Sequence, residues 1–352
     1  MKKLEGSLLM RIRFRSILLR FRDSPRIPPN IVWSRGWYGI ADWSGDSNYI
    51  YPAFPTRYRV TSLNRLVGKK GIIWLRLGSD PPKPEYDNGS PGDVVLFARE
   101  VIGRLGGSVV LITTDGDRSV PSGLPDDVVE KILDDPNIVC WYTQNLDIPL
   151  PHPKLKSIPI GIDLHTRAEN PASSVINKAI AFRRAVNNAK ANVNKKYKIW
   201  SDVHLEPNLG GLEGIPRGIL TFTRDELREG IKSGILDNQV DYPIGRLTQT
   251  EVWERYGLYR FVISLPGHGL DCHRTWEALA MGAIVITINS PIDELLKPYR
   301  VVFIERKDPN WWNSLGNSEW LHKANVRGSK GKQLELSWDH WRTVIRRQLD
   351  GS

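Results

Sequence analysis

The chain has 352 residues, a length that suits two domains better than one ordinary core. With 40% hydrophobic and 25% charged residues it has the composition of a soluble globular protein, and no apolar run approaches the roughly 20 residues that a membrane-spanning helix needs. Its two cysteines, Cys140 and Cys272, are too few for a disulfide scaffold and lie in a predicted strand and a predicted helix, which indicates reduced thiols in a reducing compartment.

The formal net charge of +10 points to an anionic partner. Because 39 acidic residues are interspersed with the basic ones and no nucleic-acid-binding motif is recognisable, the sequence does not predict nucleic-acid binding. The densest basic cluster lies near the N-terminus and could contact an acidic membrane surface, although a solvated helix or strand face is the favoured interpretation. Its members are Arg11, Arg13, Arg15, Arg20 and Arg22. We expect a cytoplasmic protein, or one at the cytoplasmic face of a membrane.

Residues 1–168 predict an N-terminal, Rossmann-like domain. An aromatic, turn-rich stretch at residues 33–58 contains Asp42 and Asp46. Aromatic faces stack on sugar rings, so this stretch either faces a sugar acceptor, which would make this the acceptor-side domain, or anchors itself to the core. Strands then alternate with helices, which predicts a parallel sheet covered on both faces. The predicted strands are 71–77, 108–114, 138–142 and 155–162, and the predicted helices are 93–105 and 126–133. Ligands of such sheets bind beyond the carboxyl ends of the strands, where Asp115, Asp117, Asn145 and Asp163 fall.

Residues 169–195 predict a connecting helix and linker, and residues 196–352 a second Rossmann-like domain. The predicted strands of this half are 197–200, 261–263, 283–288 and 301–304, with helices at 217–230 and 250–256 and a helical, tryptophan-rich C-terminus. The fold class that follows is α/β, with two Rossmann-like domains facing across a cleft.

The segment from Phe261 to Asn289 is the most informative stretch of the chain. A short apolar strand is followed by a loop with one proline and two glycines, Gly267 and Gly269, which permit positive φ. Asp271 is expected to be the N-cap of the next helix. A strand that leads through a glycine loop to a helix N-terminus presents free N–H groups and a positive dipole end, so the segment predicts an anion site, most often for phosphate.

Side chains around this loop strengthen the prediction. Arg274 falls in the first helical turn, and Glu277 follows three residues later on the same face, where it could accept hydrogen bonds from ribose hydroxyls. His268 and His273 flank the loop and could donate to a phosphate or a sugar. The alternative interpretation is that Asp271 only caps the helix and that Arg274 and Glu277 form a surface pair.

The pattern Ser264-x-Pro-Gly-x-Gly-x-Asp-Cys-His-Arg-Thr-Trp-Glu-Ala-Leu-x-x-Gly-Ala-Ile-Val-Ile resembles the donor-binding segment of exostosin-like glycosyltransferases, which have the GT-B fold. This chain has Val285 where the family usually has proline. Weaker resemblance extends to residues 141–147 and 158–163, which look like the end of the first domain in such enzymes.

The resemblance implies a hexosyl- or pentosyltransferase that moves a sugar from a nucleotide-sugar donor to a glycan or other hydroxyl acceptor, with inversion and without a metal or other cofactor. The donor would be held by the glycine loop and the helix after it, through Gly267, His268, Gly269, Asp271, His273, Arg274, Thr275 and Glu277. Arg217, predicted at the start of another helix, could neutralise further charge. An inverting reaction needs a base for the acceptor hydroxyl, and the candidates are Asp42, Asp46, Asp117 and His268.

Three other functions are weighed against this one. Asp115-Gly-Asp117 at a strand end could hold Mn²⁺ or Mg²⁺ in a metal-dependent transferase of the GT-A type. A non-catalytic nucleotide- or glycan-binding protein would use the same loop without a base. A Rossmann dehydrogenase is disfavoured, because Gly267-His-Gly269 lacks the third glycine and no acidic residue ends a strand about 20 positions later.

Overall fold

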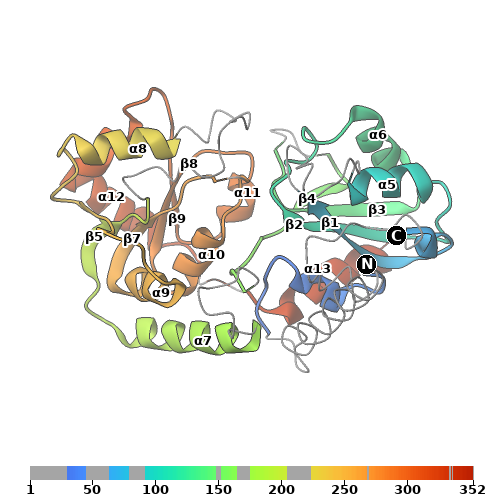
Figure 1. Ribbon diagram of the computed structural model, residues 1–352, viewed down its shortest axis with the longest axis horizontal. Helices are drawn as coiled ribbons and strands as arrows, with labels where there is room; N and C mark the ends of the chain where they lie inside the picture. Colours follow the sequence, from blue (N-terminus) through green and yellow to red (C-terminus); the bar gives the residue numbers. More distant parts are fainter. Residues whose placement is uncertain are drawn as a thin grey trace, which may run out of the picture.

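The computed structural model describes residues 30–44, 63–78, 92–147, 152–164, 175–203, 223–267, 269–332, 334 and 336–351. The basic N-terminal cluster and three predicted site residues, Asp46, Arg217 and His268, lie outside these ranges. The described residues form two halves, each built on a parallel sheet with helices on both faces (Figure 1). The predicted α/β class with two Rossmann-like halves is therefore confirmed.

The first sheet has the order β1-β2-β3-β4, and all its neighbouring strands are parallel. Its strands are β1 (Gly71–Gly78), β2 (Val109–Gly116), β3 (Ile138–Thr143) and β4 (Leu155–Ser157). Residues Val109–Asp115 of β2 are all buried, as expected for a strand covered on both faces. Helices α5 (Asp93–Glu100) and α6 (Asp126–Asp134) cover one face, while the short helix η1 (Gly36–Ile40) contacts β1. A second short helix, η2 (Asn64–Leu66), precedes β1.

The second sheet has the order β6-β5-β7-β8-β9 and is also parallel. Its strands are β5 (Lys196–Trp200), β6 (Val240–Asp241), β7 (Tyr259–Ile263), β8 (Ile284–Ile288) and β9 (Val301–Ile304). Helices α9 (Gln249–Leu258) and α10 (His273–Ala280) cover one face. The other face packs against α8 (Thr223–Lys232), η4 (Trp311–Gly316) and α12 (Ser318–Gly328), and α11 (Asp293–Leu296) follows β8.

Side chains alternate between two hydrophobic clusters along the central strands of this sheet. Val262 and Val285 belong to a cluster that continues into the first half, whereas Phe261 and Ile284 belong to a cluster confined to the second half. The face covered by α9 and α10 therefore shares its core with the first half. Because α10 follows the glycine loop, this shared core places the loop at the junction of the two halves.

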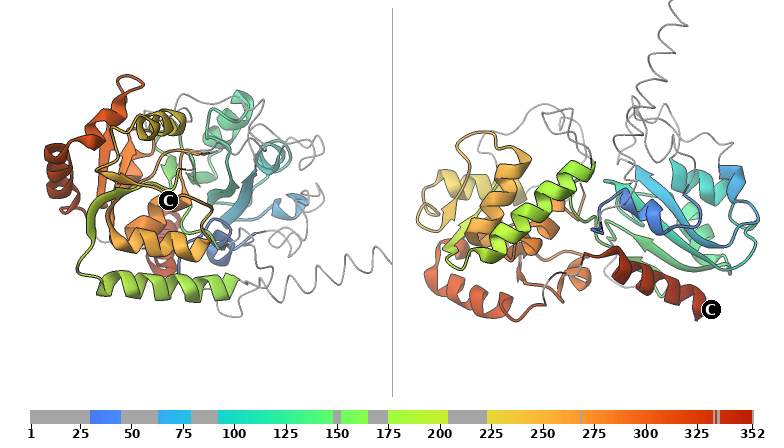
Figure 2. Two further views of the ribbon diagram at one scale, coloured as in Figure 1. Left: turned by 60° about the vertical axis from the view of Figure 1, so that its left-hand side comes forward. Right: turned by 90° about the horizontal axis from the view of Figure 1, so that it is seen from below.

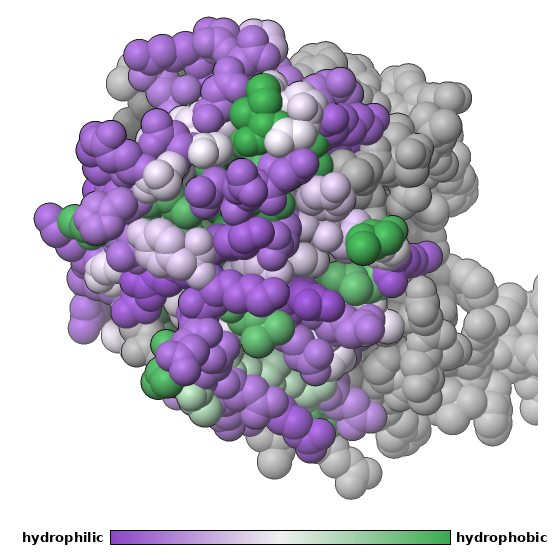
Figure 3. Space-filling view, turned by 90° about the vertical axis from the view of Figure 1, so that its left-hand side faces the viewer, coloured by the Kyte–Doolittle hydropathy of each residue, from purple (hydrophilic) through white to green (hydrophobic). Residues whose placement is uncertain are grey.

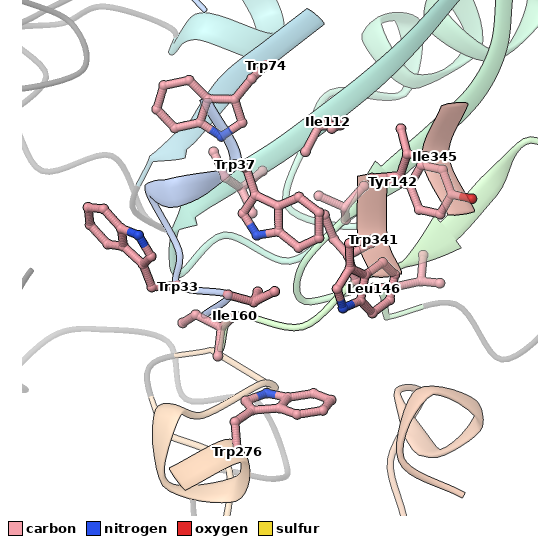
Figure 4. Packing of buried hydrophobic residues seen from close by; sticks show 14 of the residues in the cluster. Trp33, Trp37, Trp74, Ile112, Tyr142, Leu146, Ile160, Trp276, Trp341 and Ile345 are labelled. Carbon is pink, nitrogen blue, oxygen red and sulfur yellow. The ribbon is translucent and has the colours of Figure 1, made fainter. Parts of the chain in front are cut away.

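Two helices connect the halves. The connecting helix α7 (Val175–Ala191) packs on α9, and α13 (Trp338–Asp350) returns to the first sheet and contacts β2 and β3 (Figure 2, right). Trp37 lies 5.1 Å from Trp338 and 5.6 Å from Trp341, measured between ring centroids, and Trp37 and Trp341 are neighbours in Figure 4. Residues of α13 thus complete the first half, although the predicted boundary put them in the second.

Two predicted elements are shorter than expected. The helix predicted at 93–105 ends at Glu100, and Gly103 shortly after it takes a positive φ of 79°. The strand predicted at 155–162 pairs only as far as Ser157, because Pro159 has no N–H to donate to the ladder. Residues 161–162 instead form isolated bridges with Trp33.

Among the described residues, no helix combines the length and apolar character that a bilayer crossing requires. The face of the second half shown in Figure 3 is mostly hydrophilic, with hydrophobic side chains in small separate patches.

Candidate functional site

The glycine loop joins β7 to α10 where the two halves meet. Ser264 still belongs to the sheet, since its N–H donates to Ile286 O (2.8 Å). Pro266 then turns the chain out, and the Gly267 N–H donates to Gly269 O (3.0 Å). The helix begins at His273 with Cys272 as N-cap and no side-chain cap. The prediction that Asp271 caps this helix is therefore wrong.

Asp271 instead fastens the loop to the first half. One carboxylate oxygen accepts from Ile160 N–H (2.7 Å), the other accepts from Trp276 Nε1 (2.7 Å), and the Asp271 N–H donates to Asn145 Oδ1 (2.9 Å). Burial raises the pKa of Asp271 to about 7, although the hydrogen bonds from Ile160 and Trp276 oppose the rise. Ile160, on the segment that leaves β4, lies next to Trp276 of α10 in Figure 4, so the carboxylate that accepts from both is held across the junction.

Both predicted loop glycines face polar side chains at close range. A Cβ added at Gly269 would lie 2.7 Å from both the Nδ2 and the Oδ1 of Asn145, and one added at Gly267 would lie 2.7 Å from an Arg224 Nη atom. Asn145 follows β3 at the carboxyl edge of the first sheet, as predicted, and has a positive φ of 54°. The glycines are thus needed here for close approach of the loop to its neighbours.

Gly269→Ala is expected to destabilise the protein by about 1–3 kcal/mol, because the new methyl group forces the loop away from Asn145. Gly245→Ala is the matched control, since a Cβ there meets nothing within 4 Å. Urea unfolding of both variants gives the comparison. Equal midpoints for the two variants would show that the loop does not depend on contact with Asn145.

Arg274 is ion-paired at the start of α10. Its Nε donates to Asp202 Oδ2 (2.7 Å), which also accepts from the Tyr256 hydroxyl (2.8 Å). Burial alone would raise the pKa of Asp202, but the charge and hydrogen bond of Arg274, together with the Tyr256 hydroxyl, outweigh burial and lower it. Asp202 is therefore a carboxylate that holds Arg274 in place beside the loop.

Arg224 is a second guanidinium at the loop, which the sequence analysis missed. Its Nη2 donates to Leu265 O (3.1 Å), and an Nη atom of Arg274 lies 3.5 Å from the same oxygen. Burial and the nearby Arg274 lower the pKa of Arg224, and its Nε is buried without a hydrogen-bond partner in the described part of the chain. The sequence predicts a helix start at residue 217 and so selected Arg217, which lies outside the described residues. The described part of α8 runs from Thr223 and carries Arg224 as its second residue.

The remaining predicted site residues of α10 form hydrogen bonds with other parts of the protein. Glu277 is buried, and its Oε1 accepts from the Asp163 N–H (3.0 Å). Burial, followed by the nearby Asp163 carboxylate, raises the pKa of Glu277 to about 7. Thr275 Oγ1 lies 2.8 Å from Ser264 Oγ, and His273 Nδ1 lies 2.7 Å from Gly161 O. His273 and Glu277 therefore join α10 to residues 161–163, which follow β4.

The candidate site residues of the first half lie at opposite ends of the strands of the first sheet, the carboxyl edge and the amino edge. Asp115 and Asp117 lie at the carboxyl end of β2, the edge that carries Asn145. Asp42 lies at the opposite edge, since its Oδ2 accepts from the N–H of Ile72 near the start of β1 (2.8 Å) and its Oδ1 pairs with Arg346 (3.2 Å). The structure thus does not bring Asp42 to the loop, because the hydrogen bond to Ile72 fixes it at the amino edge.

The Asp115 carboxylate is paired with two arginine side chains. Its carboxylate accepts from Arg35 Nε (3.1 Å) and Arg76 Nε (2.6 Å), and its backbone has a positive φ of 61°. No group of three or more histidine, cysteine or acidic side chains within metal-binding reach occurs among the described residues. A metal bound by Asp115 and Asp117 would have to displace both guanidiniums from Asp115.

No family model matches the sequence, and no curated protein matches it either. Among solved structures, the fold is similar to a UDP-forming α,α-trehalose-phosphate synthase from Burkholderia xenovorans, with a TM-score of 0.41 and 11% sequence identity. The similarity covers 90% of this chain and 84% of the synthase. The function proposed below rests on the residues of this chain and not on that likeness.

Proposed function

We propose that the chain is a glycosyltransferase of the GT-B type, which moves a sugar from a nucleotide-sugar donor to a hydroxyl group of a glycan or other acceptor. The observation that carries the proposal is the pair of largely buried guanidiniums, Arg224 and Arg274, that meet at Leu265 O beside a helix N-terminus. Asp202 is the carboxylate that pairs with Arg274, and the Cys272 thiol beside it stays neutral because burial raises its pKa. Among Arg224, Arg274 and Asp202 one positive charge is left over, and burial favours the neutral form of Asp271 by raising its pKa to about 7, which suits a diphosphate.

The donor's diphosphate is proposed to lie on the loop between Gly267 and Asp271, with Arg224 and Arg274 on its oxygens. As the sugar leaves, negative charge grows on the diphosphate, and fixed cations stabilise that transition state more than the ground state. Glu277 is proposed to accept the ribose hydroxyls, which requires ribose to replace the Asp163 N–H that Glu277 holds in the unliganded chain.

The acceptor is proposed to bind at the carboxyl edge of the first sheet, opposite the loop. Inversion requires a base there. Asp117 lies at this edge, and His268 belongs to the loop itself but lies outside the described residues. These two remain proposed bases together with Asp46, which also lies outside the described residues, whereas Asp42 is set aside because it lies at the other edge of the sheet.

The test is a panel of nucleoside diphosphates and nucleotide-sugars, measured by thermal shift and by release of the nucleoside diphosphate, each with and without EDTA. One donor at about 100 times its Kd should stabilise the chain by about 2.7 kcal/mol, and turnover should be indifferent to EDTA. Arg224→Gln should lose the stabilisation, whereas Arg183→Gln, on the exposed face of α7, should keep it. Binding without turnover on any acceptor would indicate a nucleotide-binding protein, and loss of turnover in EDTA would indicate the metal-dependent alternative.

A further inference from the structure

The amino edge of the second sheet carries a second group of cations, on the opposite side of the sheet from the glycine loop. Lys195 immediately precedes β5, Arg260 is the second residue of β7, and Arg300 immediately precedes β9. The glycine loop, in contrast, follows the carboxyl end of β7. These three residues are called the amino-edge cluster.

Strand pairing brings Arg260 and Arg300 together. Strand β8 lies between β7 and β9, with Phe261 paired to Ile284 on one side and the Val285 N–H donating to Arg300 O (2.9 Å) on the other. The two arginines are therefore two strand spacings apart, about 10 Å between backbones. Arginine side chains are long enough to converge across that distance.

The C-terminal end of α12 lies over this gap. A Cβ at Gly328 would be 2.4 Å from Ile284 Cγ2, and one at Gly331 would be 2.3 Å from Tyr299 O, so the bare backbone of the helix end and its turn rests on the starts of β8 and β9. Arg327, Lys330 and Lys332 on this stretch are exposed and add positive charge around the cluster.

The partners of the cluster are neutral. Arg260 donates to Asn325 Oδ1 and to Ser329 Oγ (2.7 Å each), and Lys195 Nζ donates to the carbonyls of Gly257 (2.7 Å) and Met281 (3.0 Å). The Nε of Arg300 is buried with no hydrogen-bond partner in the described part of the chain.

No described carboxylate forms a salt bridge with any of the three cations. Burial, then the charges of Arg260 and Arg300, lower the pKa of Lys195 to about 8, and burial followed by Arg300 lowers the pKa of Arg260. The cluster thus concentrates positive charge that no described acidic side chain offsets, a condition that a bound anion relieves.

We propose that the amino-edge cluster is a binding site for a phosphate group, carried by a phosphorylated small molecule or by a lipid headgroup. Guanidiniums bind phosphate oxygens through two parallel N–H groups, and the buried Nε of Arg300 has no hydrogen-bond partner in the described part of the chain. The site lies at the far edge of the sheet from the donor loop, so it does not depend on the proposed transferase activity.

The first measurement is calorimetric titration of the full chain with inorganic phosphate. Arg300→Gln should weaken binding about tenfold or more, while Arg347→Gln, an exposed arginine on α13, should leave it unchanged. Arg224→Gln should also retain this binding, which separates the site from the donor loop. Phosphate affinity that is unaltered in Arg300→Gln, or lost in Arg224→Gln alone, overturns the proposal.

The second measurement is sedimentation with phosphatidylcholine vesicles, with and without phosphatidic acid. Binding that needs phosphatidic acid and Arg300 assigns the phosphate to a lipid, whereas binding of free phosphate alone assigns it to a soluble molecule. If the wild-type chain binds neither probe, there is no such site. Thermal unfolding without phosphate gives the structural comparison. Arg300→Gln removes a cation that forms no salt bridge in the described part of the chain, so it should not lower the Tm; a lowered Tm would mark Arg300 as a structural residue instead.

Discussion

Arg274→Gln is expected to lower kcat/KM for transfer by about 10²–10³, the effect of removing one fixed group that stabilises developing charge in a transition state. The same change should also destabilise the fold. It leaves the largely buried Asp202 with the Tyr256 hydroxyl as its remaining hydrogen-bond donor among the described residues, and breaking a buried ion pair from one side costs about 3–5 kcal/mol. Steady-state release of nucleoside diphosphate and urea unfolding measure the two effects separately.

The double variant Asp202→Asn/Arg274→Gln separates function from folding. With both charges removed, most of the lost stability should return, because neither member of the ion pair is left without its partner. Turnover should stay low, since the cation that faces the diphosphate is still missing. A double variant that regains turnover along with stability would show that Arg274 only supports the fold.

Glu277→Gln is expected to weaken donor binding tenfold or more while making the unliganded chain more stable at about pH 8. Burial raises the pKa of Glu277 from 4.5 to about 7, so the folded chain holds this proton more tightly than the unfolded chain does. The resulting stability is present below about pH 4.5 and is lost as the pH rises to about 7, a difference of about 3 kcal/mol at 1.36 kcal/mol per pKa unit. Glutamine keeps an oxygen to accept from Asp163 but cannot ionise, so it escapes this loss.

Glu277→Gln is informative because it should weaken donor binding and raise stability in the same samples. Unfolding at about pH 4 and pH 8 should show wild-type stability at the lower value and a gain at the higher one, and Glu254→Gln, on the exposed surface of α9, should show neither change. Nucleoside diphosphate titration at about pH 8 measures affinity in the same samples. Wild-type affinity in Glu277→Gln would remove ribose from the proposed role of this residue.

The strands were predictable because strands buried on both faces have a continuous apolar signal. Val109–Ile112 and Ile284–Ile288 are such runs, and both were placed within one or two residues. The strand, glycine loop and helix from residue 261 onward were also predicted in the right order, since proline and glycine mark the turn locally. The anion-binding interpretation was available from the same stretch.

The roles of the individual site residues depend on contacts between residues far apart in the sequence. Asp271 is a good N-cap by residue type, but its carboxylate instead reaches Ile160 on the other half. The sequence allows Glu277 to be an exposed partner of Arg274. In the structure Glu277 instead accepts from the Asp163 N–H, and Arg274 donates to Asp202. No local pattern contains these pairings, so the buried character of both acids could not be predicted.

The return of α13 to the first sheet has a consequence for how the chain acquires its structure during synthesis. Trp37 emerges from the ribosome before the second half is made, whereas Trp338 and Trp341, which cover it, emerge after the strands of the second half. Until α13 has been made, the first half exposes an aromatic surface that this helix later buries. We expect the first half to mature only after the second half has been synthesised, even though its own strands are made first.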